Sequence, residues 1–565
     1  MNKILSSLII LMIFFAWWCA LIIGLSWDEY FHHINGLVRY NFLTSLGDFQ
    51  KFEFRNNKFY PGLYDTISYA FGQIFLFINK KFYVQNIDLI MHVVNISFSS
   101  LSILGLYLLT KVIFNKKIAL FSVLLTLLNP FFFGHMGMNS KDIIVFFSFI
   151  WFCYFFYLYC KKEEKIFKNL ILASLCIGFG CGVRLTFLIV IFPAIILGFI
   201  FLIKKYKSNY LTLVKRLSLH IPIVFIITIF LVILCWPHFI VELQKGNFIE
   251  FTSLIIKNTI NWIDGPKIGL INGEFYEVFN TPRTYFLDLI IFRLPFYFTL
   301  LLISTYFLIF SKKINTNDEI ENFGKKFILL NIIAFFPIVL ALILRVNIYD
   351  NLRLFLFIIP FLSIISALAL NYFFENFKNY TQIKVITVFI FFLFSLSFYR
   401  FVILTPYQYA YVNYSYLKLE NSIGKFEHDY WGSSYKELVK KIKQKYSKEE
   451  IKNFKIADCG GGDYTLIYYL NKYLGVKKTF SNIDVLDQAT HIVMNNRVFL
   501  DVFENEHVKG LVNEKGSMLV KDMEKVSRAP NIRQTCFDYK PFSGKNAVVV
   551  SRDGLPLTIF REVNK

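Results

Sequence analysis

Apolar runs of about 20 residues recur along this chain, and each is long enough to cross the ~30 Å hydrocarbon core of a bilayer. Of the 565 residues, 56% are hydrophobic and only 18% are charged. A soluble chain of this length would need more charge to cover its water-facing surface. The sequence therefore predicts an α-helical polytopic membrane protein.

The basic residues indicate how the chain is oriented in the membrane. A net charge of +21 would suggest a nucleic-acid partner in a soluble protein. Here the lysines gather in short clusters between apolar runs, as the positive-inside rule requires of cytoplasmic loops. The clusters are Lys116-Lys117, Lys161-Lys162, Lys204-Lys205, Lys312-Lys313 and Lys325-Lys326. We therefore expect no nucleic-acid partner, and a cytoplasmic N-terminus at Lys3.

The apolar runs predict about eleven transmembrane helices within a membrane domain of residues 1–402. Their ranges are 4–25, 88–114, 118–134, 143–160, two short helices within 169–203 that are broken at Gly180, Gly182 and Arg184, 217–236, one ending at Lys312-Lys313, 327–345, one ending near 372, and 383–402. Residues 26–87 and 237–285 would form long outer loops. An odd number of spans places the C-terminal region outside the cytoplasm.

The composition changes after this point, and residues 403–565 are predicted to form a small extracytoplasmic α/β domain. Ser434 and Glu437 form a capping-box pattern before a helix that runs to about residue 446. Cys459 and Cys536 could pair if the domain faces an oxidising compartment. The other expected elements are a strand at 455–458, a helix at 465–474, a strand at 491–494 and a hairpin over 548–561 that turns at Asp553-Gly554.

Two adjacent carboxylates and two adjacent imidazoles follow the first apolar run, in Trp27-Asp28-Glu29-Tyr30-Phe31-His32-His33. A membrane anchor carries Trp, Tyr, Lys or Arg at this depth. Acidic groups there are costly and usually mark a functional site. The segment alone is equally compatible with a solvated charged loop, and His32 or His33 could simply pair with a carboxylate.

The other unusual polar residues fall on the same side of the membrane. They are His135, Lys141, Asp142, Arg184, His238, Arg283, Asp350 and Arg353. The helix interiors are nearly free of charge and show no repeat, whereas a transporter places charges inside helices, often in repeated halves. The asymmetry favours an enzyme at the outer interface over a transporter or lipid flippase.

Several of these residues also have a structural interpretation. Lys141 could extend along the membrane interface, and Asp142 could cap the helix that follows it. Arg184 could pair with a carboxylate in the same layer. A salt bridge to Asp350 would account for Arg353 without a ligand.

A substrate carried on a lipid presents its phosphate at the level of these residues. Lysine and arginine bind phosphate by charge and by the fork geometry of the guanidinium group. A carboxylate can remove the proton of an attacking hydroxyl or amine, and carboxylates can also hold a divalent metal ion. Asp28 or Glu29 as base, with Lys141, Arg184 and Arg353 on the phosphate, suits glycosyl transfer from a polyprenyl-phosphate sugar. The need for a metal stays open.

The order of these features resembles the GT-C superfamily of polytopic glycosyltransferases. Within it, the chain is similar to the dolichyl-phosphate-mannose–protein mannosyltransferase family and its bacterial aminoarabinose-transferase-like relatives. The resemblance covers roughly residues 1–440. It is carried by Asp28-Glu29, Asn139-Ser140-Lys141-Asp142, Gly182-Val183-Arg184-Leu185-Thr186, Tyr349-Asp350-Asn351-Leu352-Arg353-Leu354-Phe355-Leu356-Phe357 and Phe426-Glu427-His428-Asp429-Tyr430-Trp431-Gly432. For Asp429-Tyr430-Trp431-Gly432 within the last motif, we favour a turn that packs its aromatic rings on the membrane interface over a catalytic role.

The resemblance implies an inverting transfer to an acceptor lipid, glycan or protein. It implies that Asp28 is the general base, with Glu29 as its partner and Asp142 as the second acidic position, while Lys141 and Arg353 face the lipid phosphate. Further site candidates are His32, His33 and His135. One departure stands out, since many relatives carry His or Tyr after the late arginine and this chain has Leu354.

The sugar and the acceptor are not specified by the sequence. An oligosaccharide ligase or polymerase that uses a diphosphate-linked lipid is the alternative enzyme. The abundance of Lys, Ile, Asn and Phe is typical of an AT-rich genome. We therefore expect a bacterial inner membrane with the active site facing the periplasm, with the endoplasmic reticulum as the alternative.

Overall fold

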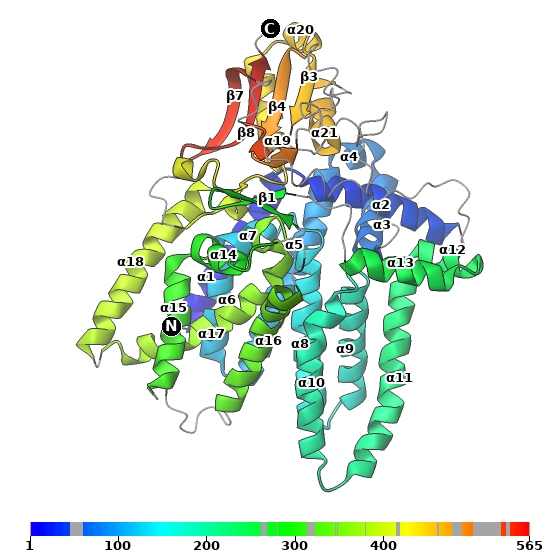
Figure 1. The fold of residues 1–565 in the computed structure, drawn as a ribbon, viewed down its shortest axis with the longest axis vertical. Helices are drawn as coiled ribbons and strands as arrows, with labels where there is room; N and C mark the ends of the chain where they lie inside the picture. The colour runs from blue at the N-terminus through cyan, green and yellow to red at the C-terminus, as the bar shows by residue number, and fades with distance from the viewer. Residues whose placement is uncertain are drawn as a thin grey trace.

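The computed structural model describes most of the chain. It covers residues 2–45, 60–260, 268–278, 281–311, 313–314, 323–344, 346, 348–378, 380–413, 419–459, 463–476, 489–500, 533–537 and 543–563. A bundle of long helices forms one part of the molecule, and a smaller domain with a β-sheet sits at one end of it (Figure 1). This is the α-helical membrane fold with a C-terminal sheet domain that the sequence predicts.

Eight helices in the described part of the chain are long and apolar enough to cross a membrane. They are α1 (Asn2–Ile22), α5 (Ile87–Ile113), α8 (Asp142–Lys161), α10 (Phe187–Lys205), α11 (Tyr210–Leu234), α16 (Phe323–Leu344), η3 with α17 (Asn351–Asn376) and α18 (Thr381–Ile403). A bent pair, α14 (Tyr285–Arg293) and α15 (Phe296–Phe310), makes a possible ninth. The two remaining predicted spans fall on shorter helices.

Proline and glycine residues account for the shorter and bent helices. The predicted span 118–134 is divided into α6 (Lys116–Leu127) and α7 (Pro130–His135), because Pro130 has no N–H to continue the first helix. Asn129 caps the second piece by accepting a hydrogen bond from the Phe132 N–H at 3.1 Å. Pro295 lies at the 116° bend between α14 and α15. The break expected within 169–203 is confirmed, since α9 (Ile166–Cys181) ends before Gly182.

The two predicted outer loops contain helices of their own. The first holds α2 (Trp27–Thr44), α3 (Leu63–Ile78) and α4 (Lys80–Gln85); the second holds α12 (Pro237–Gln244), α13 (Phe248–Ile260) and the hairpin β1 (Ile268–Ile271) and β2 (Glu274–Glu277). Helices α2, α12 and α13 lie across the ends of the long helices (Figure 1). Of these three, α2 contacts α21 of the C-terminal domain, and it begins at the predicted acidic segment.

The C-terminal domain is built on a four-stranded sheet in the order β3-β4-β8-β7. Its strands are β3 (Ile456–Cys459), β4 (His491–Asn495), β7 (Gly544–Arg552) and β8 (Leu555–Val563), and only β3 and β4 run parallel. The helices α19 (Tyr435–Lys445), α20 (Lys448–Lys452) and α21 (Asp463–Leu474) accompany it, with a second small sheet of β5 (Val498–Leu500) and β6 (Arg533–Thr535). The predicted hairpin is confirmed, and its turn residues Asp553 and Gly554 have φ of +50° and +79°.

The predicted helix after Ser434 is present, but its capping box is not formed. The Ser434 hydroxyl lies 2.8 Å from the Thr558 hydroxyl, and the Glu437 carboxylate binds Arg552 Nη2 at 2.6 Å. The sequence pattern located the helix correctly, while contacts with β7 and β8 use both side chains differently. These contacts bind α19 to the sheet.

A disulfide joins Cys459, at the end of β3, to Cys536, after β6. It spans 77 residues, so it restricts the unfolded chain strongly. We expect reduction, or Cys536→Ser, to destabilise the C-terminal domain by about 2–4 kcal/mol. Limited proteolysis and thermal unfolding with and without reductant measure this. Unchanged proteolysis of fully reduced protein would contradict it.

Candidate active site

Backbone hydrogen bonds fasten the start of α2 to the turn that follows the last membrane helix. Gly24 N–H donates to the Ser433 carbonyl at 3.0 Å, and Trp27 N–H donates to the Trp431 carbonyl at 2.9 Å. The segment that leads into Asp28 is therefore held by backbone hydrogen bonds before and after Leu25. The start of the membrane domain therefore meets residues 431–433, which lie after it in the chain.

Asp28 lies against Arg353. The Arg353 Nη1 is 3.0 Å from Asp28 Oδ2, and its Nη2 is 2.8 Å from Asp350 Oδ2. The side chain of Asp28 is 34% exposed, whereas those of Arg353 and Asp350 are 4% and 3% exposed. The guanidinium group also stacks on the ring of Trp431, 4.6 Å from its centroid. The salt bridge to Asp350 that sequence reasoning allowed is present, and the arginine contacts the predicted base as well.

Nearby charge keeps Asp28 ionised. Burial alone would raise the pKa of its carboxyl group, but Arg353, Lys141 and His32 outweigh burial and hold the pKa well below its ordinary value. A carboxylate of low pKa is a weak base. Asp28 can accept a proton efficiently only when some of this positive charge is drawn away from it.

The second acidic motif forms an ion pair of its own. Asp142, the first residue of α8, pairs with Arg184 at 3.0 Å and accepts a hydrogen bond from Asn139 Nδ2 at 2.9 Å. Asp142 is 2% exposed and Arg184 is 20% exposed. Lys141 occupies the N-cap position of α8, so the interpretation of Asp142 as the N-cap is wrong. The structural ion pair that the sequence allowed for Arg184 is present.

Lys141 lies over the ring of Tyr60, 5.4 Å from the ring centroid. None of the ion pairs in the described ranges includes it. Burial lowers the pKa of its ammonium group, although Asp28 acts in the opposite direction. Lys141 is therefore the predicted phosphate-binding cation that is least engaged with carboxylates.

The predicted histidines have separate surroundings. His32 Nδ1 lies 2.9 Å from Asp65 Oδ1, and Asp65 also contacts Arg39 at 3.6 Å. His33 Nε2 lies 3.3 Å from the Tyr83 hydroxyl, and burial lowers its pKa to about 4. His33 is thus neutral at physiological pH. His32 pairs with the buried carboxylate of Asp65, which is the structural interpretation that the sequence allowed.

His135 is fully buried at the end of α7. Its Nε2 lies 3.1 Å from the Tyr430 hydroxyl, and its ring packs against Trp431. Tyr430 and Trp431 are themselves 0% and 2% exposed. The expectation that this turn packs its aromatic rings on the membrane interface is therefore wrong, because His135 and Arg353 cover them inside the protein.

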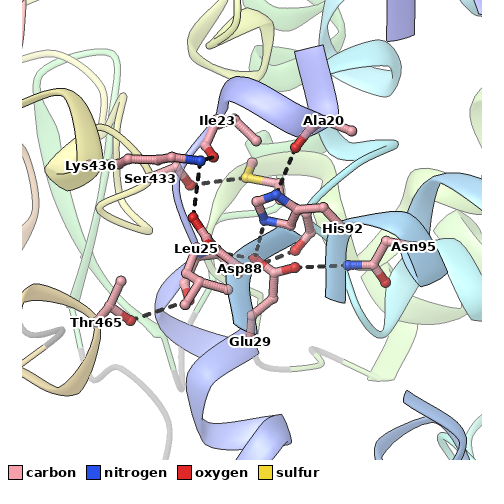
Figure 2. Close-up of polar contacts among 12 residues, drawn as sticks. Ala20, Ile23, Leu25, Glu29, Asp88, His92, Asn95, Ser433, Lys436 and Thr465 are labelled. Carbon is pink, nitrogen blue, oxygen red and sulfur yellow. Dashed lines mark hydrogen bonds and ion pairs between the residues drawn. The ribbon is translucent and has the colours of Figure 1, made fainter. Parts of the chain in front are cut away.

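Glu29 lies in a buried polar cluster with His92 and Asn95 (Figure 2). Its Oε2 accepts from the Ser26 N–H at 2.8 Å and lies 3.2 Å from His92 Nε2, while its Oε1 accepts from Asn95 Nδ2 at 2.9 Å. The carboxylate is 0% exposed. In this position Glu29 fixes the first turn of α2 against α5.

A second cluster seen in Figure 2 joins the C-terminal domain to the same region. Asp88, at the start of α5, pairs with Lys436 at 3.0 Å and with Lys472 at 3.1 Å. Lys436 also donates to the Ile23 carbonyl at 3.1 Å. Helices α19 and α21 thereby hold the segment that leads into Asp28.

We expect Glu29→Ala to destabilise the protein by about 3 kcal/mol, because it leaves buried donors without an acceptor. Glu29→Gln, of similar shape, should lose less stability. Thermal unfolding in detergent measures both variants. Wild-type stability together with lost transfer would contradict this structural role and favour the catalytic role implied by the resemblance.

Sequence reasoning did not single out several residues that complete the region. They are Arg39, Asp65, Asp88, His92, Asn95, Lys436, Lys472 and Arg497. Asp65, Asp88 and His92 lie in helices, and no second charged residue stands next to them in the sequence. Within the described residues, no three His, Cys, Asp or Glu side chains form a group that could hold a metal ion.

Residues 82–236 match the family model described as dolichyl-phosphate-mannose-protein mannosyltransferase. The match confirms the resemblance to the GT-C membrane glycosyltransferases. It includes Lys141, Asp142 and Arg184 but ends before Arg353. None of the curated proteins matches the chain significantly.

Several solved structures are distantly similar to most of the chain. ArnT from Cupriavidus metallidurans in the apo state has 11% identity and a TM-score of 0.47, covering 98% of this chain and 97% of that one. Its complex with undecaprenyl phosphate gives 12% identity and a TM-score of 0.46 with the same coverage. The archaeal oligosaccharyltransferase AglB from Archaeoglobus fulgidus has 11% identity and a TM-score of 0.43, covering 87% of this chain and 69% of that one.

Proposed function

We propose that the protein transfers a sugar from a polyprenyl-phosphate donor to an acceptor, with inversion at the anomeric carbon. One observation carries this proposal: the partly exposed carboxylate of Asp28 lies 3.0 Å from the buried guanidinium of Arg353. A base for the acceptor and a cation for the leaving phosphate are thus adjacent. The match of residues 82–236 to a family of lipid-phosphate-sugar transferases supports the same reaction.

The proposed step is a single in-line displacement. An acceptor hydroxyl or amine forms a bond to the anomeric carbon, and the bond from that carbon to the lipid phosphate oxygen breaks with its electron pair. The acceptor proton passes to the Asp28 carboxylate. Arg353 and Lys141 stabilise the charge left on the phosphate. When the phosphate attracts Arg353, the pKa of Asp28 rises, and Asp28 becomes a better base as the donor binds.

We assign this reaction to residues 1–402, and we place residues 403–565 on the extracytoplasmic side as support for the acceptor. The disulfide between Cys459 and Cys536 favours an oxidising compartment. A bacterial inner membrane with a periplasmic active site suits both the disulfide and the lysine clusters.

The test is transfer by purified protein in liposomes with a panel of radiolabelled polyprenyl-phosphate sugars and a lysate of candidate acceptors. A parallel arm supplies polyprenyl-diphosphate oligosaccharides, and each arm is repeated with a metal chelator. Transfer from the monophosphate donors is expected. Transfer from diphosphate donors alone would make the protein a ligase or polymerase. Translocation of lipid without transfer from either donor would make it a flippase.

A further inference from the structure

We propose that Arg497, a residue of the C-terminal domain, completes the phosphate-binding part of the active site. This inference rests on the proposed function and extends it, because it gives the C-terminal domain a direct contact with the lipid-linked donor. Arg497 lies between β4 and β5, and the family match ends far before it.

The side chain of Arg497 reaches into the site described above. Its Nη2 lies 3.8 Å from Asp350 Oδ1, the carboxylate that also binds Arg353. Its Nη1 donates to the Tyr430 carbonyl at 2.9 Å. The guanidinium group stacks on the ring of Trp27, 4.5 Å from the centroid. Arg497 therefore lies beside both the Arg353 pair and the residue that precedes Asp28.

The number of positive and negative side chains in the site indicates what Arg497 contributes to donor binding. Among the described residues of the site, the cations Lys141, Arg184 and Arg353 are equal in number to three carboxylates. Arg184 is already paired with one of these carboxylates and Arg353 with the other two. Those carboxylates are Asp28, Asp142 and Asp350. A sugar-linked phosphodiester brings one further negative charge. Arg497 supplies the positive charge that matches it.

The geometry also leaves Arg497 able to bind a ligand. Its contact to Asp350 at 3.8 Å is long, while Arg353 holds the same carboxylate at 2.8 Å. Its side chain is 12% exposed, against 4% for Arg353. A guanidinium group that is loosely paired can turn one edge of its fork toward a phosphate at little cost. Asp350 stays neutralised by Arg353 when this happens.

The disulfide holds Arg497 in this place. The Cys536 N–H donates to the Arg497 carbonyl at 3.3 Å, and Cys536 is bonded to Cys459. On the other side, Asn496 Nδ2 donates to the Phe426 carbonyl at 3.2 Å. The segment is thus fixed to β3 and to the turn that carries Tyr430. Cys536 is a positioning residue for Arg497.

The experiment compares wild type, Arg497→Ala, Arg497→Lys and the control Arg561→Ala in lipid nanodiscs. Arg561 lies in β8 of the same domain, but its Nε binds the Asn546 side chain at 2.8 Å rather than the site. Binding of polyprenyl phosphate and of inorganic phosphate is measured alongside sugar transfer. Arg497→Ala should weaken lipid-phosphate binding by about tenfold to a hundredfold and raise the donor KM similarly. Arg497→Lys should recover part of the loss, and Arg561→Ala should match wild type.

Each outcome decides one question. If wild type transfers sugar and Arg497→Ala keeps the wild-type donor KM and lipid affinity, the inference is overturned and the proposed function stands. If Arg497→Ala loses phosphate affinity but wild type transfers no sugar, the anion site stands and the proposed reaction fails. If wild type binds neither lipid phosphate nor inorganic phosphate, both fail.

The variant Cys536→Ser tests whether the disulfide affects donor binding by positioning Arg497. It should weaken donor binding less than Arg497→Ala does, and the double variant should bind no worse than Arg497→Ala alone. Additive losses in the double variant would show that the disulfide does not act through Arg497.

Discussion

Asp28→Asn should lower the rate of sugar transfer by about a thousandfold or more, with binding of the donor lipid retained. The substitution removes the proton acceptor from the proposed step, and general-base catalysis contributes typically about 10²–10⁴-fold. Asparagine keeps the size of the side chain and can still contact Arg353. Single-turnover transfer with saturating donor measures the chemical step directly.

The control for Asp28→Asn is Glu274→Gln, which neutralises an exposed carboxylate in β2. It should leave transfer unchanged. Transfer by Asp28→Asn at the wild-type rate would show that another group accepts the proton.

The pH profile gives a further check on Asp28. Its pKa in the free enzyme is depressed, so its ionised form is lost only when the pH falls through that low value. The acid limb of kcat/KM that belongs to Asp28 should therefore lie below the range of an ordinary carboxyl group. In kcat, measured with donor bound, the limb should move upward as the phosphate draws Arg353 away.

Arg353→Ala should abolish transfer and destabilise the protein by about 3–5 kcal/mol, because it leaves Asp350 buried without its closest cation. Arg353→Lys should keep most of the stability and raise the donor KM, since an ammonium group cannot bind Asp28 and Asp350 with a fork. Thermal unfolding and steady-state transfer with varied donor measure the two effects separately. The control is Arg283→Ala, an exposed arginine of the second outer loop.

A double variant separates the structural role of Arg353 from its role with the donor. Asp350→Asn added to Arg353→Ala removes the unmatched charge and should recover part of the stability. It should recover none of the transfer. Recovery of both would mean that Arg353 serves the fold alone.

The membrane helices were predictable because hydropathy is a local property of the chain. Every predicted span falls on one or two helices, and described lysine clusters such as Lys161-Lys162 and Lys204-Lys205 lie at helix ends as expected. The sequence was less informative where a proline changes direction. Pro130 divides one predicted span, and Pro295 lies at the bend of another.

The site was only partly predictable, because its contacts join distant parts of the chain. Arg353 and Asp28 are 325 residues apart, and nothing in either segment specifies their pairing. Asp65 and His92 were missed because a single charged or ionisable residue in a largely apolar helix shows no pattern. Glu29 shares its motif with Asp28, but the rotation of an α-helix sends neighbouring side chains to different faces. Their different surroundings follow from that rotation.

The fastening of Gly24 and Trp27 to residues 431–433 has a consequence for biosynthesis. The ribosome makes Asp28 about four hundred residues before it makes the residues that hold this segment in place. At typical rates of about 5–20 residues per second, some twenty seconds or more separate the two. A nascent chain therefore inserts its membrane helices before its carboxylate is set against Arg353. On the proposed mechanism, the chain therefore gains its transfer activity only after residues 431–433 have been made.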